Sequence, residues 1–326
     1  GEQGHNIGRV ISILARLDAP GVTVNRYCSS SLMTTRMAAH AIRAGEGDVF
    51  ISAGVECVSR YGSGYPDPPD SFNPRLVPGN SEEYPDIYIA MGNTAENVAE
   101  RENISREEMD RYAVKSQNAA VKARDDGFFD REIIPVPLPS GETFSKDDGP
   151  RPGTNIEALA QLQPVFREGG KVTAGNSCPL NDGAAAVVVM SDSRAKELGI
   201  KPLARIVSTG VSSLEPEFMG LGPIEASRAA LRRAGMTIDD VDILEINEAF
   251  AAQVIPSARA LGVDPFSDKL NPHGGAIALG HPFGMTGARI LCTILNGLEH
   301  KNASIGLETM CVGGGQGMAM IFERLN

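Results

Sequence analysis

Residues 22–54 read VTVNRYCSSSLMTTRMAAHAIRAGEGDVFISAG, and this stretch decides the fold class. Residues 22–24 are a short β-branched run, and residues 32–42 carry apolar side chains at roughly helical spacing, closed by the stop signal Gly45. Residues 48–53 predict a buried strand. A strand, a helix and a strand in succession predict parallel pairing and an α/β architecture.

The same alternation returns in the second half of the chain. Strands are predicted over residues 184–190, 203–211, 241–246, 304–309 and 317–323. Helices are predicted over residues 193–198, 225–234, 248–260 and 283–298. Pro256 lies inside the third of these helices, where a proline should cause a kink or a break.

Between these regions the character of the sequence changes. Residues 61–86 are rich in Pro, Gly, Ser, Asp and Asn and predict a long irregular excursion. Ser105 and Glu108 form a capping box that opens a helix to about Asp126, with Gly127 behind it. We interpret this region as an inserted, loop-rich subdomain, and such excursions are usually functional.

Composition excludes several classes of protein. The 326 residues predict roughly two domains at about 150 residues each. The net charge of −11 argues against a nucleic acid or an anionic membrane as the main partner. No run of eighteen apolar residues predicts a membrane-spanning helix. Residues 1–5 carry neither Met nor the basic and apolar segments of a secretory signal, so we expect a cytoplasmic protein.

The five cysteines are widely spaced and odd in number, which argues against a disulfide framework. No C-x-x-C pair is present, so we expect no metal site. Glycine is enriched at 36 of 326 residues, against a background of about 7%. Much of it lies in two clusters, residues 274–287 and 313–317. Such clusters indicate tight turns or close backbone approach, and chemistry should be sought there.

Cys28 lies where the first predicted strand ends and a helix begins. A helix N-terminus places partial positive charge beside the sulfur, which should lower the pKa of the thiol and favour the thiolate. The alternative is a buried structural cysteine.

The two glycine clusters present three further candidates. His281 stands in the sharply bent segment GGAIALGHP, although a lone histidine is more often structural. Cys311 opens the segment CVGGGQG, a turn whose free N–H groups could bind an oxyanion. No Lys-Ser/Thr follows as in a phosphate loop, and no dinucleotide fingerprint is formed. Asn247 follows a predicted strand, where α/β sheets bind ligands, but it could equally be an N-cap.

Two thiols, an imidazole and an amide at such positions favour acyl transfer through a thioester over metal or hydride chemistry. The whole chain resembles the thiolases in seven strings that occur in order: NRYCSSS, TAENVA, TAGNSCPLNDGAA, MGLGP, NEAFAAQ, GGAIALGHP and CVGGGQG. The resemblance implies a five-layered αβαβα body, with an inserted loop domain that holds coenzyme A, in a homodimer or homotetramer. It divides the chain into residues 1–54 and 151–190 for the first half, 55–150 for the insert, and 191–326 for the second half.

The resemblance also assigns roles. Cys28 would be the acylated nucleophile, His281 the base that activates it and later the incoming thiol, and Cys311 the second acid/base at the α-carbon. Asn247 would hold a water that forms an oxyanion hole with His281, and the amides of Cys28 and Gly313 would form the other. A histidine suits such a base, because its ordinary pKa is near neutrality.

The resemblance places coenzyme A, a co-substrate and not a permanently bound cofactor, at five positions. These are Met91, Arg151, Phe166, Ala174 and Phe250. From the residues alone, Arg151 would be a solvated surface charge.

Some positions depart from the family pattern. The nucleophile motif reads CSSS where CSSG is commoner, Ala90 stands where short-chain biosynthetic members carry His, and Cys178 where they carry Ser. These departures favour a degradative 3-ketoacyl-CoA thiolase that releases acetyl-CoA or propionyl-CoA over an acetoacetyl-CoA thiolase. NRYCSSS and GHPFGMTGAR look most like actinobacterial degradative members, some of which act on steroid side chains.

Two alternatives remain at this level. A decarboxylating ketoacyl synthase shares the fold but would carry His in place of Cys311. A catalytically inactive, coenzyme A-binding protein of the same fold is the other. The family's leading strands have no counterpart at the start of the sequence, so we expect the N-terminal strands to be missing.

Overall fold

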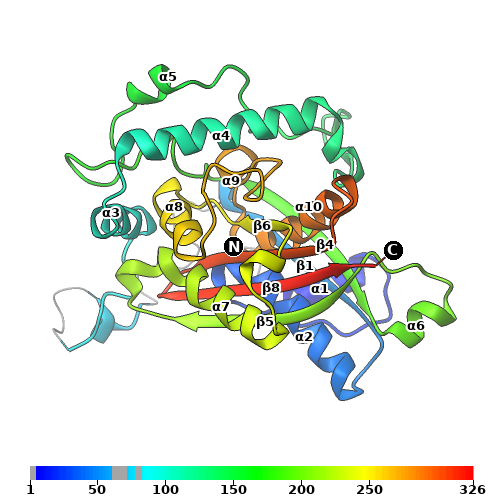
Figure 1. The fold of residues 1–326 in the computed structure, drawn as a ribbon. Coiled ribbons are helices and arrows are strands. Elements are labelled where there is room, and N and C mark those ends of the chain that lie inside the picture. The colour runs from blue at the N-terminus through cyan, green and yellow to red at the C-terminus, as the bar shows by residue number, and fades with distance from the viewer. Residues whose placement is uncertain (1–4, 61–71, 78–82, 326) are drawn as a thin grey trace.

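A four-stranded sheet forms the centre of the molecule (Figure 1). The computed structural model describes residues 5–60, 72–77 and 83–325. The strand order is β5-β8-β7-β6. These strands are β5 (Ala204–Ser213), β6 (Ile243–Ile246), β7 (Ile305–Val312) and β8 (Gln316–Arg324). β8 pairs antiparallel with both neighbours, whereas β6 pairs parallel with β7.

Helices cover both faces of this sheet, which is why β6 to β8 are nearly continuous runs of buried residues. One face packs against α7 (Gly222–Ala234) and α8 (Ala251–Ala260), in a core that includes Ile255 and Leu307. The other packs against α2 (Ser30–Ala44) and α10 (Thr286–His300), in a core that includes Leu32 and Phe322.

A second sheet lies on the far side of α2 and α10. It pairs β1 (Val49–Cys57) antiparallel with β4 (Asp182–Met190), from Val49 opposite Met190 to Cys57 opposite Asp182. The described elements therefore trace four layers: α7 with α8, the four-stranded sheet, α2 with α10, and the β1–β4 sheet. The outer face of the β1–β4 sheet carries Val49, Ile51 and Val188, which are 47%, 56% and 59% exposed.

The strand–helix–strand prediction over residues 22–54 is correct only in part. The helix and the second strand form, but residues 22–24 are not a strand, and the described pairing of β1 is antiparallel. A β-branched run becomes a strand only beside a partner that takes up its backbone hydrogen bonds. Here the N–H of Gly8 donates to the Thr23 hydroxyl oxygen instead, at 3.4 Å.

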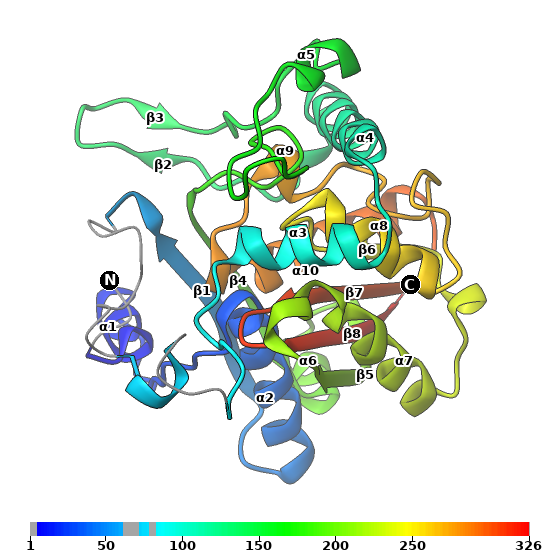
Figure 2. The ribbon, with the colours of Figure 1, turned by 90° about the vertical axis from the view of Figure 1, so that its left-hand side faces the viewer.

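The described part of the segment between β1 and β4 carries three further α-helices. These are α3 (Met91–Arg101), α4 (Arg106–Asp125) and α5 (Ile156–Ala160). The predicted cap of α4 is confirmed, because the Glu108 N–H donates to the Ser105 hydroxyl at 3.1 Å. α4 lies across α8 and α9 (Ala276–Leu279), and the short hairpin β2 (Val136–Pro137) and β3 (Thr143–Phe144) projects beyond it (Figure 2). Of the predicted excursion over residues 61–86, residues 61–71 and 78–82 lie outside the described residues.

The remaining elements are short. They are α1 (Ile7–Leu14), α6 (Asp192–Glu197) and the 3₁₀ helices Tyr27–Ser29, Val58–Arg60, Pro74–Leu76, Phe128–Arg131, Pro216–Leu221, Ile238–Asp240 and Phe283–Met285. Pro256 does not break α8, which is buried through its first eight residues and continues to Ala260. Within the described part of the chain, no helix has the length and apolar character that crossing a membrane requires.

Candidate active site

Cys28 is held at the start of α2. It lies in the 3₁₀ helix Tyr27–Ser29 and is 8% exposed, and the backbone amides of Gly313 and of Cys28 itself act on its thiol. These two amides lower the pKa of the thiol, but burial outweighs them and raises it to about 12. The sequence-based expectation of a lowered pKa was therefore wrong. Local helix geometry is visible in a sequence, whereas the desolvation that dominates here is not.

His281 is buried directly after Gly280, whose φ of 90° requires glycine. Its Nδ1 lies 2.6 Å from the Thr286 hydroxyl, and that hydroxyl donates to the Pro282 carbonyl at 3.2 Å. Since the hydroxyl proton is engaged there, Nδ1 carries the imidazole proton and Nε2 presents a lone pair. The structure thereby fixes which ring nitrogen can take up a proton.

Burial lowers the pKa of His281 to about 3, and the nearby positive charge of Arg289 acts in the same direction. The expectation of a base near neutrality was thus wrong for this state of the site. At neutral pH the His281 imidazole is therefore neutral and the Cys28 thiol is protonated.

Asn247 follows β6 and is 1% exposed. Its backbone N–H donates to the Thr309 carbonyl at 3.0 Å, which fixes it at the end of the sheet. Its side-chain Nδ2 lies 3.3 Å from His281 Nε2, so the structure brings these two predicted residues together. Its Oδ1 is buried and has no hydrogen-bond partner among the described residues. Asn247 is not an N-cap, because α8 begins later and Phe250 occupies that position.

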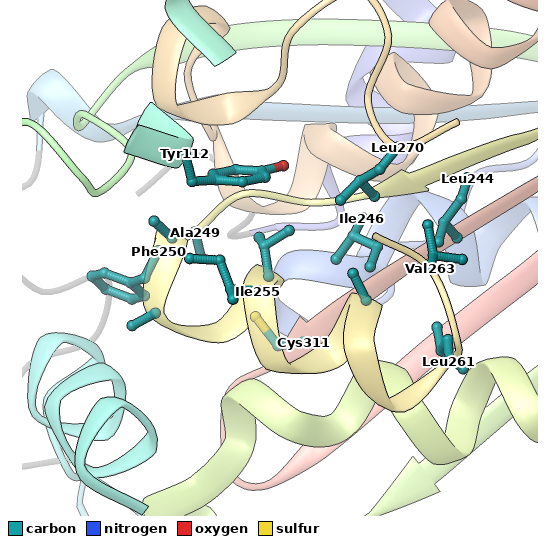
Figure 3. Close-up of a cluster of buried hydrophobic side chains, with 14 of the residues drawn as sticks. Tyr112, Leu244, Ile246, Ala249, Phe250, Ile255, Leu261, Val263, Leu270 and Cys311 are labelled. Carbon is teal, nitrogen blue, oxygen red and sulfur yellow. The ribbon is translucent and has the colours of Figure 1, made fainter. Parts of the chain in front are cut away.

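Cys311 lies on β7, opposite Gly317 of β8, and is fully buried. Its sulfur lies beneath α8, among the apolar side chains around Ile255 (Figure 3). Burial raises the pKa of the Cys311 thiol well above its ordinary value, and charge on Cys28 or Cys178 raises it further. The site therefore contains a third thiol, Cys178, which the sequence marked only as a departure from the family pattern.

Behind Asn247, the buried Glu248 carboxylate joins three distant segments. Its Oε1 accepts from the Tyr112 hydroxyl at 2.9 Å and from Asn271 Nδ2 at 2.8 Å. Its Oε2 accepts from the Ser116 hydroxyl at 2.5 Å and from the Ile277 N–H at 3.1 Å. Tyr112 and Ser116 lie on α4 and Ile277 lies shortly before His281, so this carboxylate ties α4 to the segment that carries His281.

We expect Glu248→Gln to lower the free energy of unfolding by about 2–4 kcal/mol, because an amide nitrogen would face donors that now have an acceptor. Urea denaturation followed by circular dichroism measures this loss. Glu107→Gln, an exposed change on α4, is the matched control and should have little effect. Equal stability of the two variants would contradict the role of Glu248 as a structural centre.

A second acidic feature lies on the opposite face of the sheet, towards α10. Glu245 and Glu308 stand side by side on the parallel strands β6 and β7, both buried. Glu245 Oε1, both carboxyl oxygens of Glu308 and Nη1 of Arg289 have no hydrogen-bond partner among the described residues. Burial raises the pKa of Glu245 to about 8 and that of Glu308 well above its ordinary value. Each carboxyl therefore resists ionisation at neutral pH.

We expect Glu308→Gln to become progressively more stable than the unmodified chain as pH rises from about 5 to 8. The folded chain retains a proton on Glu308 that the unfolded chain releases, so its free energy of unfolding falls by up to about 1.4 kcal/mol per pH unit for this carboxyl. The buried imidazole of His281 acts in the opposite sense at acid pH, so both proteins must be compared at each pH. A pH-independent difference in urea denaturation would contradict this expectation.

The structure brings together some of the predicted coenzyme A positions. Met91 begins α3, and a Cβ on the next residue, Gly92, would lie 2.1 Å from the Phe166 ring. That ring meets Phe250 edge-on at 6.1 Å between centroids and lines a surface hollow of about 360 Å³ formed by residues 163–169.

The other two positions are less closely tied to this group. Ala174 is exposed in the loop before Cys178. Arg151 is held through its backbone N–H, which donates to Gln117 Oε1 at 2.8 Å. The Arg151 side chain is exposed.

Comparison with known proteins agrees with this arrangement. Two family models match, described as the N-terminal domain and the C-terminal domain of thiolase, over residues 1–193 and 200–324. The 3-ketoacyl-CoA thiolases of Marinomonas sp. (strain MWYL1) and Salmonella typhimurium are each 44% identical over 99% of this chain, which covers 83% and 84% of their lengths. An acetyl-CoA acetyltransferase of Syntrophomonas wolfei is 43% identical, covering 99% of this chain and 84% of that protein.

A solved structure has the same fold. The crystal structure of the Bacillus anthracis acetyl-CoA acetyltransferase superposes with a TM-score of 0.88 at 38% identity, covering 98% of this chain and 84% of that one. Fold and site together define an α/β acyltransferase of acyl-CoA thioesters. More particularly, the chain belongs to the thiolase family. The fold class and the family expected from the sequence are thus confirmed.

Proposed function

We propose that this protein cleaves 3-ketoacyl-CoA with coenzyme A, giving acetyl-CoA or propionyl-CoA and a shortened acyl-CoA through an acyl group on Cys28. The observation that carries the proposal is the contact of the Asn247 amide with His281 Nε2 at 3.3 Å, in a site where the backbone amides of Gly313 and Cys28 act on the Cys28 thiol. Such amides stabilise the oxyanion of a tetrahedral intermediate, typically by about 3 kcal/mol each. The names of the Marinomonas and Salmonella relatives support the degradative direction.

The first half-reaction forms the acyl-enzyme. His281 Nε2 takes the Cys28 proton as the sulfur attacks the keto carbon, and the Cys28 and Gly313 amides hold the oxyanion. The bond between the α-carbon and the keto carbon breaks, and its electron pair forms an enolate stabilised by His281 and a water on Asn247. Cys311 donates its proton to the α-carbon, and acetyl-CoA or propionyl-CoA leaves.

The second half-reaction transfers the acyl group to coenzyme A and regenerates the free enzyme. The imidazolium restores the proton of Cys311, so His281 is neutral when coenzyme A enters. It then takes the proton of the coenzyme A thiol, whose sulfur attacks the acyl-enzyme. When the tetrahedral intermediate collapses, the Cys28 sulfur leaves and recovers a proton from His281. The buried neutral imidazole and thiols are the resting forms that this cycle requires.

We propose that coenzyme A binds at the surface hollow formed by residues 163–169. Met91, Phe166 and Phe250 would contact coenzyme A around the hollow at residues 163–169, with Ala174 and Arg151 contributing from neighbouring loops. Coenzyme A is a co-substrate here, and we propose no permanently bound cofactor. We propose that the fold consists of two similar halves, formed by residues 1–54 with 151–190 and by residues 191–326, and that residues 55–150 are inserted into the first half.

We propose a homodimer or homotetramer in the cytoplasm. The exposed apolar face of the β1–β4 sheet supports association, because such a face is stabilised by burial against another surface.

A panel of 3-ketoacyl-CoA thioesters of increasing chain length, with one steroid side-chain thioester, tests the function. Thiolysis of the longer members at higher kcat/KM than acetoacetyl-CoA supports the proposal. Activity confined to acetoacetyl-CoA would favour the second candidate, an acetoacetyl-CoA thiolase, which the name of the Syntrophomonas relative supports. Coenzyme A binding without turnover would instead indicate an inactive binding protein.

A further inference from the structure

We propose that Gln253 is a positioning residue that holds Cys311 as a thiol and joins it to the backbone of Asn247. The inference rests on the proposed function and adds a residue to its proton-transfer machinery. Gln253 lies in the first turn of α8 and is fully buried. Among the described residues its side-chain amide hydrogen-bonds the Asn247 backbone and Cys311, but neither Cys28 nor His281, so we expect it to affect proton transfer by Cys311 more than acylation of Cys28.

The orientation of the Gln253 amide follows from its partners. Its Nε2 donates to the Asn247 carbonyl at 3.1 Å, and only the nitrogen end of an amide can make that bond. The amide oxygen is therefore directed away from Asn247, and the Cys311 sulfur donates to it at 3.9 Å. Figure 3 shows the Cys311 sulfur directly beneath α8, the helix that carries Gln253.

Packing holds the glutamine in this position. A Cβ on Gly220 would lie 2.7 Å from the Gln253 Cβ, so the backbone of the neighbouring 3₁₀ helix is in close contact with this side chain. One turn further along α8, the buried Ser257 hydroxyl donates to the Gly220 carbonyl at 3.3 Å. Glycine at position 220 lets the two helices approach closely enough to confine the Gln253 side chain.

The chemistry of the contact suits the cleavage direction. A carbonyl oxygen accepts from a thiol but repels a thiolate, so this hydrogen bond favours protonated Cys311. In cleavage, Cys311 must enter the reaction protonated, because its proton passes to the α-carbon as the carbon–carbon bond breaks. The resulting thiolate loses its hydrogen bond to Gln253, which favours recovery of a proton from the His281 imidazolium before the next turnover.

Two substitutions separate this role from simple packing. Gln253→Met keeps the shape but removes both the acceptor for Cys311 and the donor to the Asn247 carbonyl. Gln253→Glu keeps an acceptor in both protonation states, but once ionised it loses the donor and places a negative charge beside Cys311. Two half-reactions are measured with acetyl-CoA across pH 5–9: acylation of Cys28 by mass spectrometry, and exchange of the α-protons with deuterated water. Ser257→Ala, which removes the hydrogen bond to Gly220 but leaves both hydrogen bonds of Gln253 in place, is the matched control for packing.

We expect Gln253→Met to lower the maximal rate of α-proton exchange about 10- to 100-fold, a part of the range for losing a general acid or base, because the Cys311 sulfur is no longer held in place, while acylation changes less than about threefold. Its exchange profile should also shift to lower pH, because the thiolate is no longer disfavoured by the amide oxygen. Gln253→Glu should exchange nearly normally at acid pH and lose exchange as its carboxyl ionises. Ser257→Ala should keep the unmodified profile.

A Gln253→Met profile with unchanged pH dependence, or equal losses in both half-reactions, would overturn the inference. Normal exchange by Gln253→Met at every pH would do the same, and in both cases the proposed function survives. An unmodified protein that neither acylates nor exchanges would instead remove the proposed function, and the role of Gln253 with it.

Discussion

Replacing Cys28 with alanine is expected to abolish acyl transfer completely, while leaving the protein folded. The substitution removes the sulfur that carries the acyl group in the proposed cycle, and alanine offers no nucleophile in its place. Intact-protein mass spectrometry after incubation with acetyl-CoA should show acylation of the unmodified chain and none of Cys28→Ala. Cys28→Ser should retain at most slight activity, because an alkoxide is far harder to form than a thiolate.

The labelling reagent must be the thioester itself. Burial raises the pKa of Cys28 to about 12, so little thiolate is present at neutral pH. The thiolate is the form that reacts with an alkylating agent, so such an agent should not label Cys28 preferentially. In the proposed cycle His281 takes the proton from the sulfur as the sulfur attacks a bound thioester. Peptide mapping that finds the acyl group on Cys57 or Cys292 would disprove the assignment of the nucleophile.

Replacing Cys311 with alanine is expected to separate the two half-reactions. The variant should still accept an acyl group on Cys28 from acetyl-CoA, since that step forms no carbanion. It should fail to exchange α-protons with deuterated water and should lose carbon–carbon cleavage by about 10²–10⁴-fold, the usual range for deleting a general acid or base. His281→Ala should impair both half-reactions, because the same imidazole serves the sulfur and the enolate.

Measuring acylation and exchange on both variants tests these roles together. Unaltered secondary structure by circular dichroism is the control for folding, since both side chains are buried. Normal α-proton exchange by the Cys311 variant would refute its role as the acid at the α-carbon, even if the nucleophile assignment stands.

Sequence reasoning was strongest where burial is continuous. The strands β5 to β8 and the helix α10 were predicted within a few residues, because apolar runs and glycine stops mark them directly. Asn247 and His281 were also predicted at one site, and their side chains lie within 3.3 Å. Both residues lie in short, distinctive motifs, so each could be identified without knowledge of the fold.

The sequence was weakest where distant segments meet. Residues 22–24 satisfy every local criterion for a strand, yet no neighbouring strand pairs with them among the described residues. The ionisation of Cys28 was predicted in the wrong direction, because a sequence shows helix ends but not the loss of water around a sulfur. The hydrogen bonds from Tyr112 to Glu248 and from Cys311 to Gln253 join residues that are 136 and 58 positions apart. A local sequence pattern does not predict contacts over such separations.

The contacts of Glu248 have a practical consequence for engineering acyl-chain preference. Transplanting the region around α4 from a relative would change the hydroxyl donors at positions 112 and 116 unless the donor sequence supplied equivalents. A chimera that lacks both hydroxyls would leave the buried Glu248 carboxylate, which directly follows Asn247, with only two of its four hydrogen-bond partners. In a hybrid enzyme, Tyr112 and Ser116 should therefore come from the same parent protein as the motif NEAF, even where the rest of the α4 region comes from the other parent.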